Sequence, residues 1–287
     1  MKVFVAKDAG YCFGVRDAVN LAYKTADKYG NVYMLGDIVH NENVVKDLKN
    51  AGTKVVQSLK EIPEKTPVLF RAHGTETQVW KNAKEKNMNI IDATCPLVRE
   101  IHDEVSKLEK ERRRIIIIGD HGHDEVIGIA SQVADPIIIE NPEEAKSLRK
   151  MKKAGIVSQS TQTIENVQNI INILMTKVFD LRFVNTICFP TKRNQNQIKE
   201  LADLCDVMLI IGSFTSANSK RLSQLSKLRN SNSYQITCAK DICSDWFLNA
   251  ESVGISAGAS TPDNLIEEVV EFVKHLDPEM KKEMVYG

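Results

Sequence analysis

A cysteine recurs three times along this chain in the same surroundings. Each copy follows a short apolar run and precedes a stretch of helical periodicity, in the segments Gly10–Gly14, Ala93–Pro96 and Thr186–Pro190. A glycine keeps the same phase, lying 24 residues after each cysteine (36 − 12, 119 − 95 and 212 − 188). The pairs are Cys12 with Gly36, Cys95 with Gly119, and Cys188 with Gly212. This agreement predicts three diverged copies of one repeat, each of which contributes one thiol to a shared centre.

Short apolar runs alternate with longer helical stretches, a pattern that is typical of parallel α/β structure. The third copy lacks a fourth strand of its own, whereas strand 2–5 precedes Cys12 as the fourth strands precede Cys95 and Cys188. The expected strands are 2–5, 32–35, 54–56, 68–70, 89–91, 115–118, 136–139, 155–157, 181–184, 207–211, 233–236 and 252–255.

We therefore expect an α/β fold of three pseudo-repeated domains, each with a small, mainly parallel sheet. The predicted boundaries are 13–95, 96–188 and 189–287, and the N-terminal segment 1–12 is expected to complete the third sheet. The polar residues after Leu276 are expected to form a loose tail.

The overall charge excludes a strong electrostatic attraction to polyanions, because 38 basic residues balance 38 acidic ones. No apolar run approaches the ~18 residues of a membrane span. Met1–Val5 has the pattern of a strand and not of a signal peptide. We expect a cytoplasmic protein without nucleic-acid or membrane partners.

The recurring thiols have three possible roles: zinc ligands, ligands of an iron–sulfur cluster, or buried structural residues. In a reducing compartment, regularly placed cysteines are more often metal ligands or nucleophiles than disulfides. Structural zinc favours four ligands in closely spaced pairs, and these three are far apart. Iron–sulfur clusters are held by thiolates, and three ligands would leave one iron with an open position that can act as a Lewis acid. Cys205 begins an apolar strand and is expected in the core, while Cys238 and Cys243 occur in the third copy only.

Polar side chains gather where the expected strands end, and the carboxyl ends of parallel strands are where ligands bind. His40 and His123 each lie four residues after the repeat glycine, and Ser216 takes that place in the third copy. A second set of strand ends carries His73, the pair Ser160 and Thr161, and Ser260. Loops rich in His, Ser, Thr and Asn next to helix N-termini suit a small phosphorylated ligand.

Two residues beyond His123, Glu125 is the candidate proton carrier. A lone histidine after a strand is usually structural, but the shared repeat offset favours a functional role for His40 and His123. His102 and His275 fall on charged helical faces and are expected to have no role in the site, and the role of His121 stays open.

Taken together, these residues resemble the family of 4-hydroxy-3-methylbut-2-enyl diphosphate reductases, which act last in the non-mevalonate isoprenoid pathway. The similarity covers nearly the whole chain. Its motifs are Val39-His40-Asn41, Arg71-Ala72-His73-Gly74, Asp92-Ala93-Thr94-Cys95-Pro96, Gly122-His123-Asp124-Glu125 and Asn185-Thr186-Ile187-Cys188.

The resemblance implies three similar domains around a central [4Fe–4S] cluster held by Cys12, Cys95 and Cys188. It implies a proton-donating glutamate at Glu125, supported by His123. The substrate-binding residues that it implies are His40, His73, His123, Ser160, Thr161, Ser216, Ala217, Asn218 and Ser260.

This chain departs from the family pattern at a few of these positions. Thr215 replaces an asparagine, Ala217 replaces a serine and Ser160 replaces a threonine. Ala217 removes one hydroxyl from the expected phosphate site but keeps its backbone N–H. We expect these changes to alter affinity more than the class of reaction.

The implied reaction is a two-electron reductive dehydroxylation of an allylic diphosphate to isopentenyl and dimethylallyl diphosphate, with the substrate hydroxyl on the open iron. A ferredoxin or flavodoxin is the expected electron donor, because the chain has no Gly-x-Gly-x-x-Gly nucleotide fingerprint. Two other classes remain open: an iron–sulfur sensor or electron carrier, and a non-redox hydrolase that uses a Cys–His pair.

Overall fold

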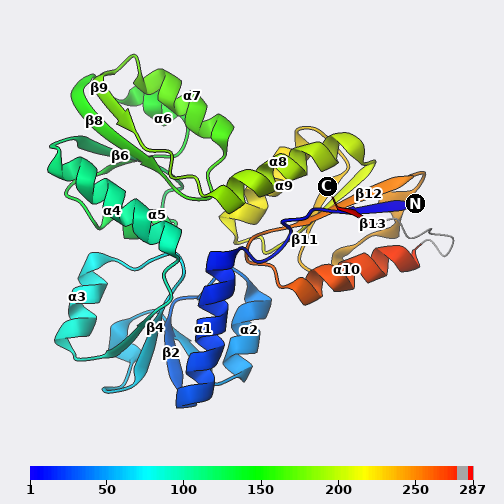
Figure 1. Ribbon diagram of the computed structural model, residues 1–287, viewed down its shortest axis with the longest axis horizontal. Helices are drawn as coiled ribbons and strands as arrows, with labels where there is room; N and C mark the ends of the chain where they lie inside the picture. Colours follow the sequence, from blue (N-terminus) through cyan, green and yellow to red (C-terminus); the bar gives the residue numbers. More distant parts are fainter. Residues whose placement is uncertain (277–283, 287) are drawn as a thin grey trace. The chain divides into compact units, whose positions relative to one another are not determined.

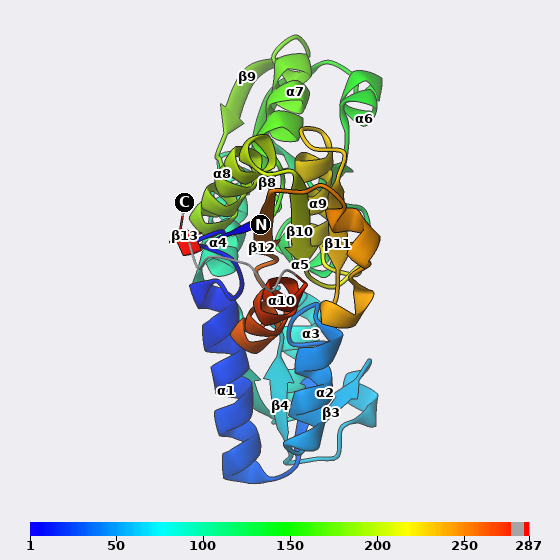
Figure 2. The ribbon, with the colours of Figure 1, turned by 90° about the vertical axis from the view of Figure 1, so that its right-hand side faces the viewer.

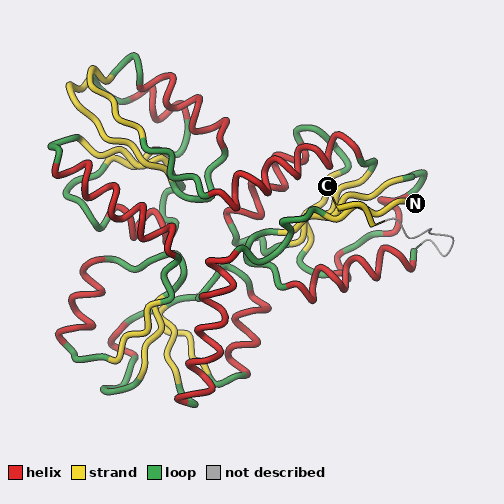
Figure 3. The backbone as a smooth tube through the Cα atoms, in the orientation of Figure 1, coloured by secondary structure: helices red, strands yellow, loops and turns green. Residues whose placement is uncertain are grey.

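The strands of this chain form three separate sheets in a computed structural model that describes residues 1–276 and 284–286. Neighbouring strands in this part of the chain pair in parallel. Figure 3 shows each group of strands flanked by helices. The predicted fold class, three α/β repeats with small parallel sheets, is therefore confirmed.

The first sheet has the strand order β3-β2-β4-β5. Its central strands are continuous apolar runs, because a parallel sheet covered on both faces has no solvated side; Val68, Leu69 and Phe70 are fully buried. Helix α3 lies on one side of these strands and α1 and α2 on the other (Figures 1 and 2). The elements are α1 (Phe13–Tyr29), β2 (Val32–Leu35), α2 (Glu42–Asn50), β3 (Thr53–Val56), η1 (Leu59–Glu61), β4 (Pro67–Phe70), α3 (Thr77–Glu85) and β5 (Asn89–Asp92).

The second sheet repeats this order as β7-β6-β8-β9. One face packs against Ile101 and Val105 of α4 with Val126 of α5, and the other packs against Val167 and Ile170 of α7. The elements are α4 (Pro96–Lys110), β6 (Arg114–Ile118), α5 (Asp124–Ala130), β7 (Ile137–Ile139), α6 (Pro142–Ser147), β8 (Met151–Ser158), α7 (Ile164–Leu174) and β9 (Val178–Phe183).

The third sheet has the order β11-β10-β12-β1-β13. Helices α8 and α9 cover one face and α10 covers the other (Figure 1). Strand β1 pairs with β12, in the place that β5 and β9 take in the other sheets. The elements are β1 (Lys2–Val5), α8 (Phe189–Leu204), β10 (Val207–Ile211), α9 (Ala217–Lys227), β11 (Ser233–Ile236), η2 (Ala239–Asp241), η3 (Ser244–Phe247), β12 (Ser252–Ala257), α10 (Asp263–His275) and β13 (Met284–Tyr286).

Of the expected loose tail, residues 277–283 and 287 lie outside the described residues. The expectation is wrong for Met284–Tyr286, which pair with β1 as strand β13. Within the described ranges, no helix combines the length and the apolar character that a membrane span requires.

The chain divides into two compact units. Unit 1 comprises residues 1–15, 40–44 and 189–287, and unit 2 comprises residues 16–39 and 45–188. Unit 1 contains the third sheet, and unit 2 contains the first and second sheets. The three predicted domain boundaries stay a prediction.

The repeat glycines occupy equivalent places in the three sheets. Each donates its backbone N–H to the last residue of the neighbouring edge strand, in the pairs Gly36–Val56, Gly119–Ile139 and Gly212–Ile236, at 2.8 to 2.9 Å. A side chain at Gly119 would begin 2.5 Å from Val126, and one at Gly212 would begin 2.2 Å from the Ser219 hydroxyl. At Gly119 and Gly212 the following helix leaves no room for a side chain, whereas at Gly36 the backbone has a φ of +73° and the Arg71 side chain lies close.

Candidate active site

Each recurring cysteine immediately precedes the first residue of a helix. These first residues are Phe13 of α1, Pro96 of α4 and Phe189 of α8. Cys95 is the N-cap of its helix, and all three cysteines are partly buried. A helix N-terminus presents backbone N–H groups and partial positive charge, which stabilise a thiolate. The donor set therefore fits a thiolate-bound metal cluster.

The backbone of each cysteine is tied to one of the loops that were predicted to bind substrate. The cysteine N–H donates to a loop carbonyl oxygen in the pairs Cys12–Ala259, Cys95–Ala72 and Cys188–Ser160, at 3.3, 3.0 and 3.0 Å. Cys12 lies in unit 1, and Cys95 and Cys188 lie in unit 2. That the three thiols hold one cluster stays a prediction.

Cys205 differs from these three in its burial. It lies in the core between α8 and β10 and is 6% exposed, as the sequence predicted. Burial, and then the charge of Asp206, raise the pKa of its thiol to about 12. The Cys205 thiol therefore stays protonated at neutral pH and is a poor metal ligand.

Glu125 lies in the first turn of α5 and is only 2% exposed. Its two carboxylate oxygens accept from the same residue: Oε1 from the Ser160 N–H at 2.6 Å, and Oε2 from the Ser160 hydroxyl at 2.8 Å. This two-point contact fixes the plane of the carboxyl group. Ser160 also accepts the Cys188 N–H through its carbonyl oxygen, so one residue contacts both the candidate acid and a candidate ligand.

His123 is the N-cap of α5, and its Nδ1 accepts a hydrogen bond from the Glu125 N–H at 3.1 Å. Since Nδ1 accepts, the neutral imidazole carries its proton on Nε2, which is a donor. The ring meets that of His73 edge to face, with centroids 5.8 Å apart. Unit 2 therefore brings together four predicted site residues: His73, His123, Glu125 and Ser160.

The loop that carries His73 is braced against α5 by an ion pair. Arg71 Nη1 lies 2.6 Å from Asp124 Oδ2, and both side chains are largely buried. The Arg71 guanidinium also lies over Gly36, where a Cβ would sit 2.9 Å from Nη1 and where φ is +73°. Thr161, beside Ser160, accepts from the Gln159 amide at 3.0 Å, which fixes its side chain.

Unit 1 brings together the remaining predicted residues. Ser216 caps α9 by accepting the Ser219 N–H at 3.3 Å, and Ala217 is the first residue of that helix, where backbone N–H groups have no acceptor within the helix. The Ser260 hydroxyl donates to the His40 carbonyl oxygen at 3.0 Å. Asn218 follows Ala217 and is 5% exposed.

Two buried polar atoms at the start of α9 have no hydrogen-bond partner among the described residues: the Asn218 amide nitrogen and the Ser219 hydroxyl. A buried donor without an acceptor costs about 1–3 kcal/mol. An anion at this helix N-terminus would accept from Asn218 and interact favourably with the helix dipole. The arrangement therefore suits a phosphate group.

Sequence reasoning missed a contact within unit 1, between the start of α2 and the loop before α9. Glu42 accepts from the Ser213 hydroxyl at 2.7 Å and from the Thr215 hydroxyl at 3.3 Å. Ser213 also accepts the Thr215 N–H at 3.0 Å. Thr215, one of the departures from the family pattern, thus bonds to the residue that follows His40-Asn41. Glu42 follows the motif Val39-His40-Asn41, but no pattern in the neighbouring sequence indicates that it bonds to Ser213 and Thr215.

Two further histidines, His121 and His102, lie in different surroundings. His121 lies at the surface with Nε2 2.9 Å from Glu144 Oε2, outside the His123 cluster. His102, on a helical face that is charged in sequence, is partly buried. Its ring lies within 3.5 Å of the positions that Cβ atoms on Gly74 and Gly128 would occupy, and burial lowers its pKa, against the opposing effects of Asp103 and Asp92.

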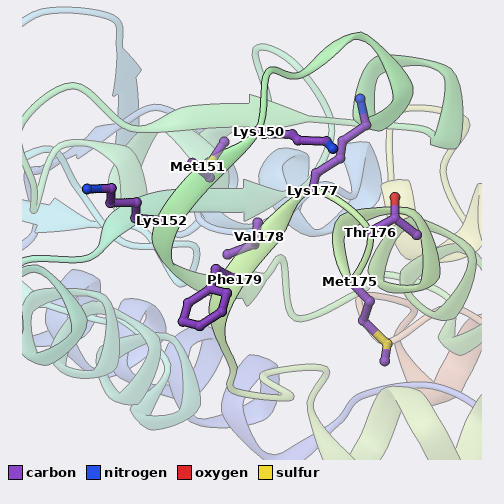
Figure 4. Close-up of a pocket in the computed structure, with 8 residues that line it drawn as sticks. All are labelled: Lys150, Met151, Lys152, Met175, Thr176, Lys177, Val178 and Phe179. Atoms are coloured by element: carbon purple, nitrogen blue, oxygen red, sulfur yellow. The ribbon is translucent and has the colours of Figure 1, made fainter.

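A hollow of about 430 Å³ lies elsewhere in unit 2 (Figure 4). Its lining includes Met151 and Val178, the first residues of β8 and β9, together with the exposed Phe179. Glu125 bonds to the loop beyond the other end of β8. The hollow is therefore not part of the candidate site.

Known proteins resemble the chain over nearly its whole length. Residues 3–274 match the family described as LytB protein. A protein of Geobacter sulfurreducens named 4-hydroxy-3-methylbut-2-enyl diphosphate reductase is 38% identical over 282 residues, which are 98% of this chain and 100% of that protein. A protein of the same name from Nitratiruptor sp. is 38% identical over 277 residues, 96% of this chain and 99% of the relative.

Two solved structures are similar as well. The E-1-hydroxy-2-methyl-but-2-enyl-4-diphosphate reductase from Plasmodium falciparum superposes with a TM-score of 0.92 at 28% identity, covering 97% of this chain and 89% of that one. A structure described as (E)-4-hydroxy-3-methyl-but-2-enyl diphosphate reductase, the terminal enzyme of the non-mevalonate pathway, has a TM-score of 0.69 at 36% identity and covers 96% of this chain and 100% of its own.

Proposed function

The chain belongs to the LytB protein family, and we propose on this basis that it is a 4-hydroxy-3-methylbut-2-enyl diphosphate reductase. The reaction breaks the allylic C–O bond, consumes two electrons and two protons, and releases one water. The products are isopentenyl and dimethylallyl diphosphate. Relatives that bear this name match from one end of the chain to the other, which supports the assignment.

The observation that carries the proposal is the fixed position of the Glu125 carboxyl group. It is buried, fixed at both oxygens by Ser160 and adjacent to a histidine whose Nε2 is a donor. An oriented acid of this kind can protonate a departing hydroxyl, so that water leaves instead of hydroxide. The role of His123 is to hold the substrate oxygen in reach and to fix the first turn of α5.

Cys12, Cys95 and Cys188 are assigned as the ligands of a [4Fe–4S] cluster. When bound, the cluster supplies electrons one at a time and an iron site that polarises the substrate C–O bond. The fit rests on three partly buried thiols at helix N-termini, in contrast to the protonated Cys205 thiol.

The diphosphate is assigned to hydroxyl, amide and imidazole donors. In unit 1 these are His40, Ser216, Asn218, Ser260 and the backbone N–H of Ala217. In unit 2 they are His73, His123, Ser160 and Thr161. The buried Asn218 amide nitrogen supports the assignment most directly, because it has no acceptor among the described residues.

The electrons are assigned to a ferredoxin or flavodoxin, since the sequence carries no nucleotide-binding fingerprint. The enzyme would accept them singly and use two per substrate molecule.

Anaerobic turnover tests this function. The protein is purified without oxygen and mixed with 4-hydroxy-3-methylbut-2-enyl diphosphate and reduced methyl viologen. We expect two dye molecules to be oxidised for each C5 diphosphate formed. Phosphate release without dye oxidation would support the hydrolase instead, and a spectral response without any product would support the sensor or carrier.

A further inference from the structure

Two phenylalanine rings of unit 1 stack on each other at the surface. Phe13 and Phe189 have ring centroids 5.5 Å apart and planes inclined by 8°. They remain 39% and 50% exposed. Each ring is the first residue of its helix and follows a proposed cluster ligand, Cys12 or Cys188, by one position.

The stack gives this surface a defined shape. Phe13 begins α1 and Phe189 begins α8, so the pair joins two helix N-termini that are far apart in the sequence. Since each ring supports the other, the two present a single aromatic face to solvent. Aromatic residues are enriched in protein interfaces, where they supply contact area at a low cost in side-chain entropy.

Positive charge lies next to the rings. The Arg193 guanidinium is 5.7 Å from the centroid of Phe189. Asp8 holds it with an Nη2–Oδ1 distance of 2.6 Å, and Gln197 donates to the other Asp8 oxygen at 2.8 Å. The Arg193 side chain nevertheless stays 60% exposed. Asp8 balances the charge of Arg193, and Lys192 in the same helical turn adds one further positive charge to these three residues.

The basic side chains of Lys192 and Arg193 do not stabilise the helix that carries them. The first turn of α8 contains no acidic residue, although the partial positive charge of a helix N-terminus favours acidic side chains there and disfavours basic ones. Asp8 pairs with Arg193 within the chain, but the Arg193 side chain is still 60% exposed. Arg193 and Lys192 therefore remain available to a negatively charged partner.

We propose that Phe13, Phe189, Lys192 and Arg193, the aromatic–basic patch, form the docking surface for an acidic one-electron carrier protein. The inference rests on the proposed function, because it is the reductase that requires external electrons. At each encounter the carrier is oxidised by one electron and the enzyme is reduced by one, so two encounters supply one turnover.

A second copy of this chain is the less suitable occupant. A symmetric dimer through the patch would place Lys192 and Arg193 against the same residues of the other copy. An acidic carrier is attracted by these charges, and weak electron-transfer complexes need only a small interface. The sequence position of both rings beside proposed cluster ligands favours a redox partner over other acidic proteins.

The test compares two reductants on the same variants. Reduced methyl viologen is a small dye that needs no docking surface, and reduced ferredoxin is the protein donor. The variants are Phe13→Ala/Phe189→Ala and, because ring removal at a helix start can disturb folding, the surface change Lys192→Glu. Phe179→Ala is the matched control, since Phe179 is 95% exposed on strand β9, beside the hollow of Figure 4.

We expect dye-driven turnover within about twofold of wild type for all variants. The KM for ferredoxin should rise at least tenfold in the double variant, and Lys192→Glu should both raise it and weaken the salt dependence of kcat/KM. Phe179→Ala should change neither assay.

The outcomes separate the two proposals. A wild-type protein that is inactive with the dye would contradict the reductase itself. A dye-active enzyme whose ferredoxin kinetics are unchanged in both the double variant and Lys192→Glu would overturn the docking surface. Equal losses with both reductants in the Lys192→Glu variant would also overturn it, since they would place the residue's effect in catalysis and not in docking.

Discussion

At the scale of single residues, Glu125 is the most constrained polar group of the candidate site. Ser160 holds both carboxylate oxygens, and the Glu125 N–H donates to His123. These contacts hold the carboxyl group in one orientation in the structure. Its position is therefore suited to proton transfer at a defined atom.

Replacing Glu125 with glutamine should separate chemistry from binding. Glutamine keeps the size of the side chain and can still accept at its amide oxygen, but it cannot deliver a proton. We expect kcat to fall by about 10²- to 10⁴-fold, the usual contribution of a general acid, with KM and cluster content close to wild type. Near-normal kcat in single-turnover and steady-state assays would remove Glu125 as the proton donor.

The corresponding control is Glu144→Gln. The Glu144 carboxylate contacts a histidine, His121, at the surface of the same unit. Its replacement should leave kcat unchanged, which would show that the loss at Glu125 is specific to that carboxyl group.

Asn218 tests the phosphate site. Its buried amide nitrogen has no partner among the described residues, so binding an anion would satisfy it. A hydrogen bond to a charged group contributes about 1.5–3 kcal/mol, and Asn218→Ala should therefore raise KM by about 10- to 100-fold. An unchanged KM, or a raised affinity for inorganic diphosphate in a calorimetric titration, would show that Asn218 does not face the phosphate.

Ala217→Ser is the opposite change at the neighbouring position. It restores the hydroxyl that the family pattern contains, and its net value is about 0.5–1.5 kcal/mol at most. KM should stay equal or fall modestly. A clear rise would mean that this position lies away from the substrate.

At the scale of helices and strands, the repeat could be predicted because its landmarks are local. Cysteine precedes a helix start in all three copies. Glycine follows a strand in each copy, where either the next helix is close (Gly119 and Gly212) or φ is positive (Gly36). Runs such as Ile115–Ile118 identify buried parallel strands by composition alone.

The start of β8 could not be predicted in the same way. The strand begins at Met151 and includes Lys152 and Lys153, whereas the apolar pattern suggested residues 155–157. It extends because its neighbour β9 pairs with it from Val178 onward. Tertiary pairing thus determines a boundary that the side chains do not indicate.

The stability of the protein at different pH values tests how His102 of α4 packs against the Gly74 loop and α5. Burial against the Gly74 loop and α5 lowers its pKa below the ordinary value of 6.5. The unfolded chain therefore binds this proton more readily, and the free energy of unfolding should decrease as the pH falls below about 6.5. In the variant His102→Gln this part of the acid sensitivity should disappear.

The measurement is the denaturant midpoint of both proteins between pH 5 and pH 8. The difference between them should be constant above about pH 7 and should shift in favour of the variant at lower pH. Parallel curves over the whole range would mean that His102 is not held neutral in the folded protein.

At the scale of the whole molecule, the three sheets share one order over four strands, to which the third sheet adds β13. Strand β1 at one end of the chain pairs with β12 near the other. The repeat pattern predicted the pairing of β1 with the third sheet, because the third copy lacks a fourth strand of its own. The contacts of the site were less predictable: Glu125 with Ser160 spans 35 residues, and Glu42 with Ser213 spans 171. Such pairs depend on how loops meet in space, which no local pattern encodes.

The central claim is that the three recurring cysteines hold one iron–sulfur cluster. The most direct measurement is the iron and sulfide content, with the visible spectrum, of anaerobically purified protein. We compare wild type with Cys188→Ser and with Cys243→Ser, a change at an exposed cysteine outside the repeat. Wild type and Cys243→Ser should contain roughly four irons per chain, and Cys188→Ser should lose the cluster or hold it weakly. An iron-free wild type, or a Cys188→Ser variant with unchanged iron and sulfide, would contradict the account.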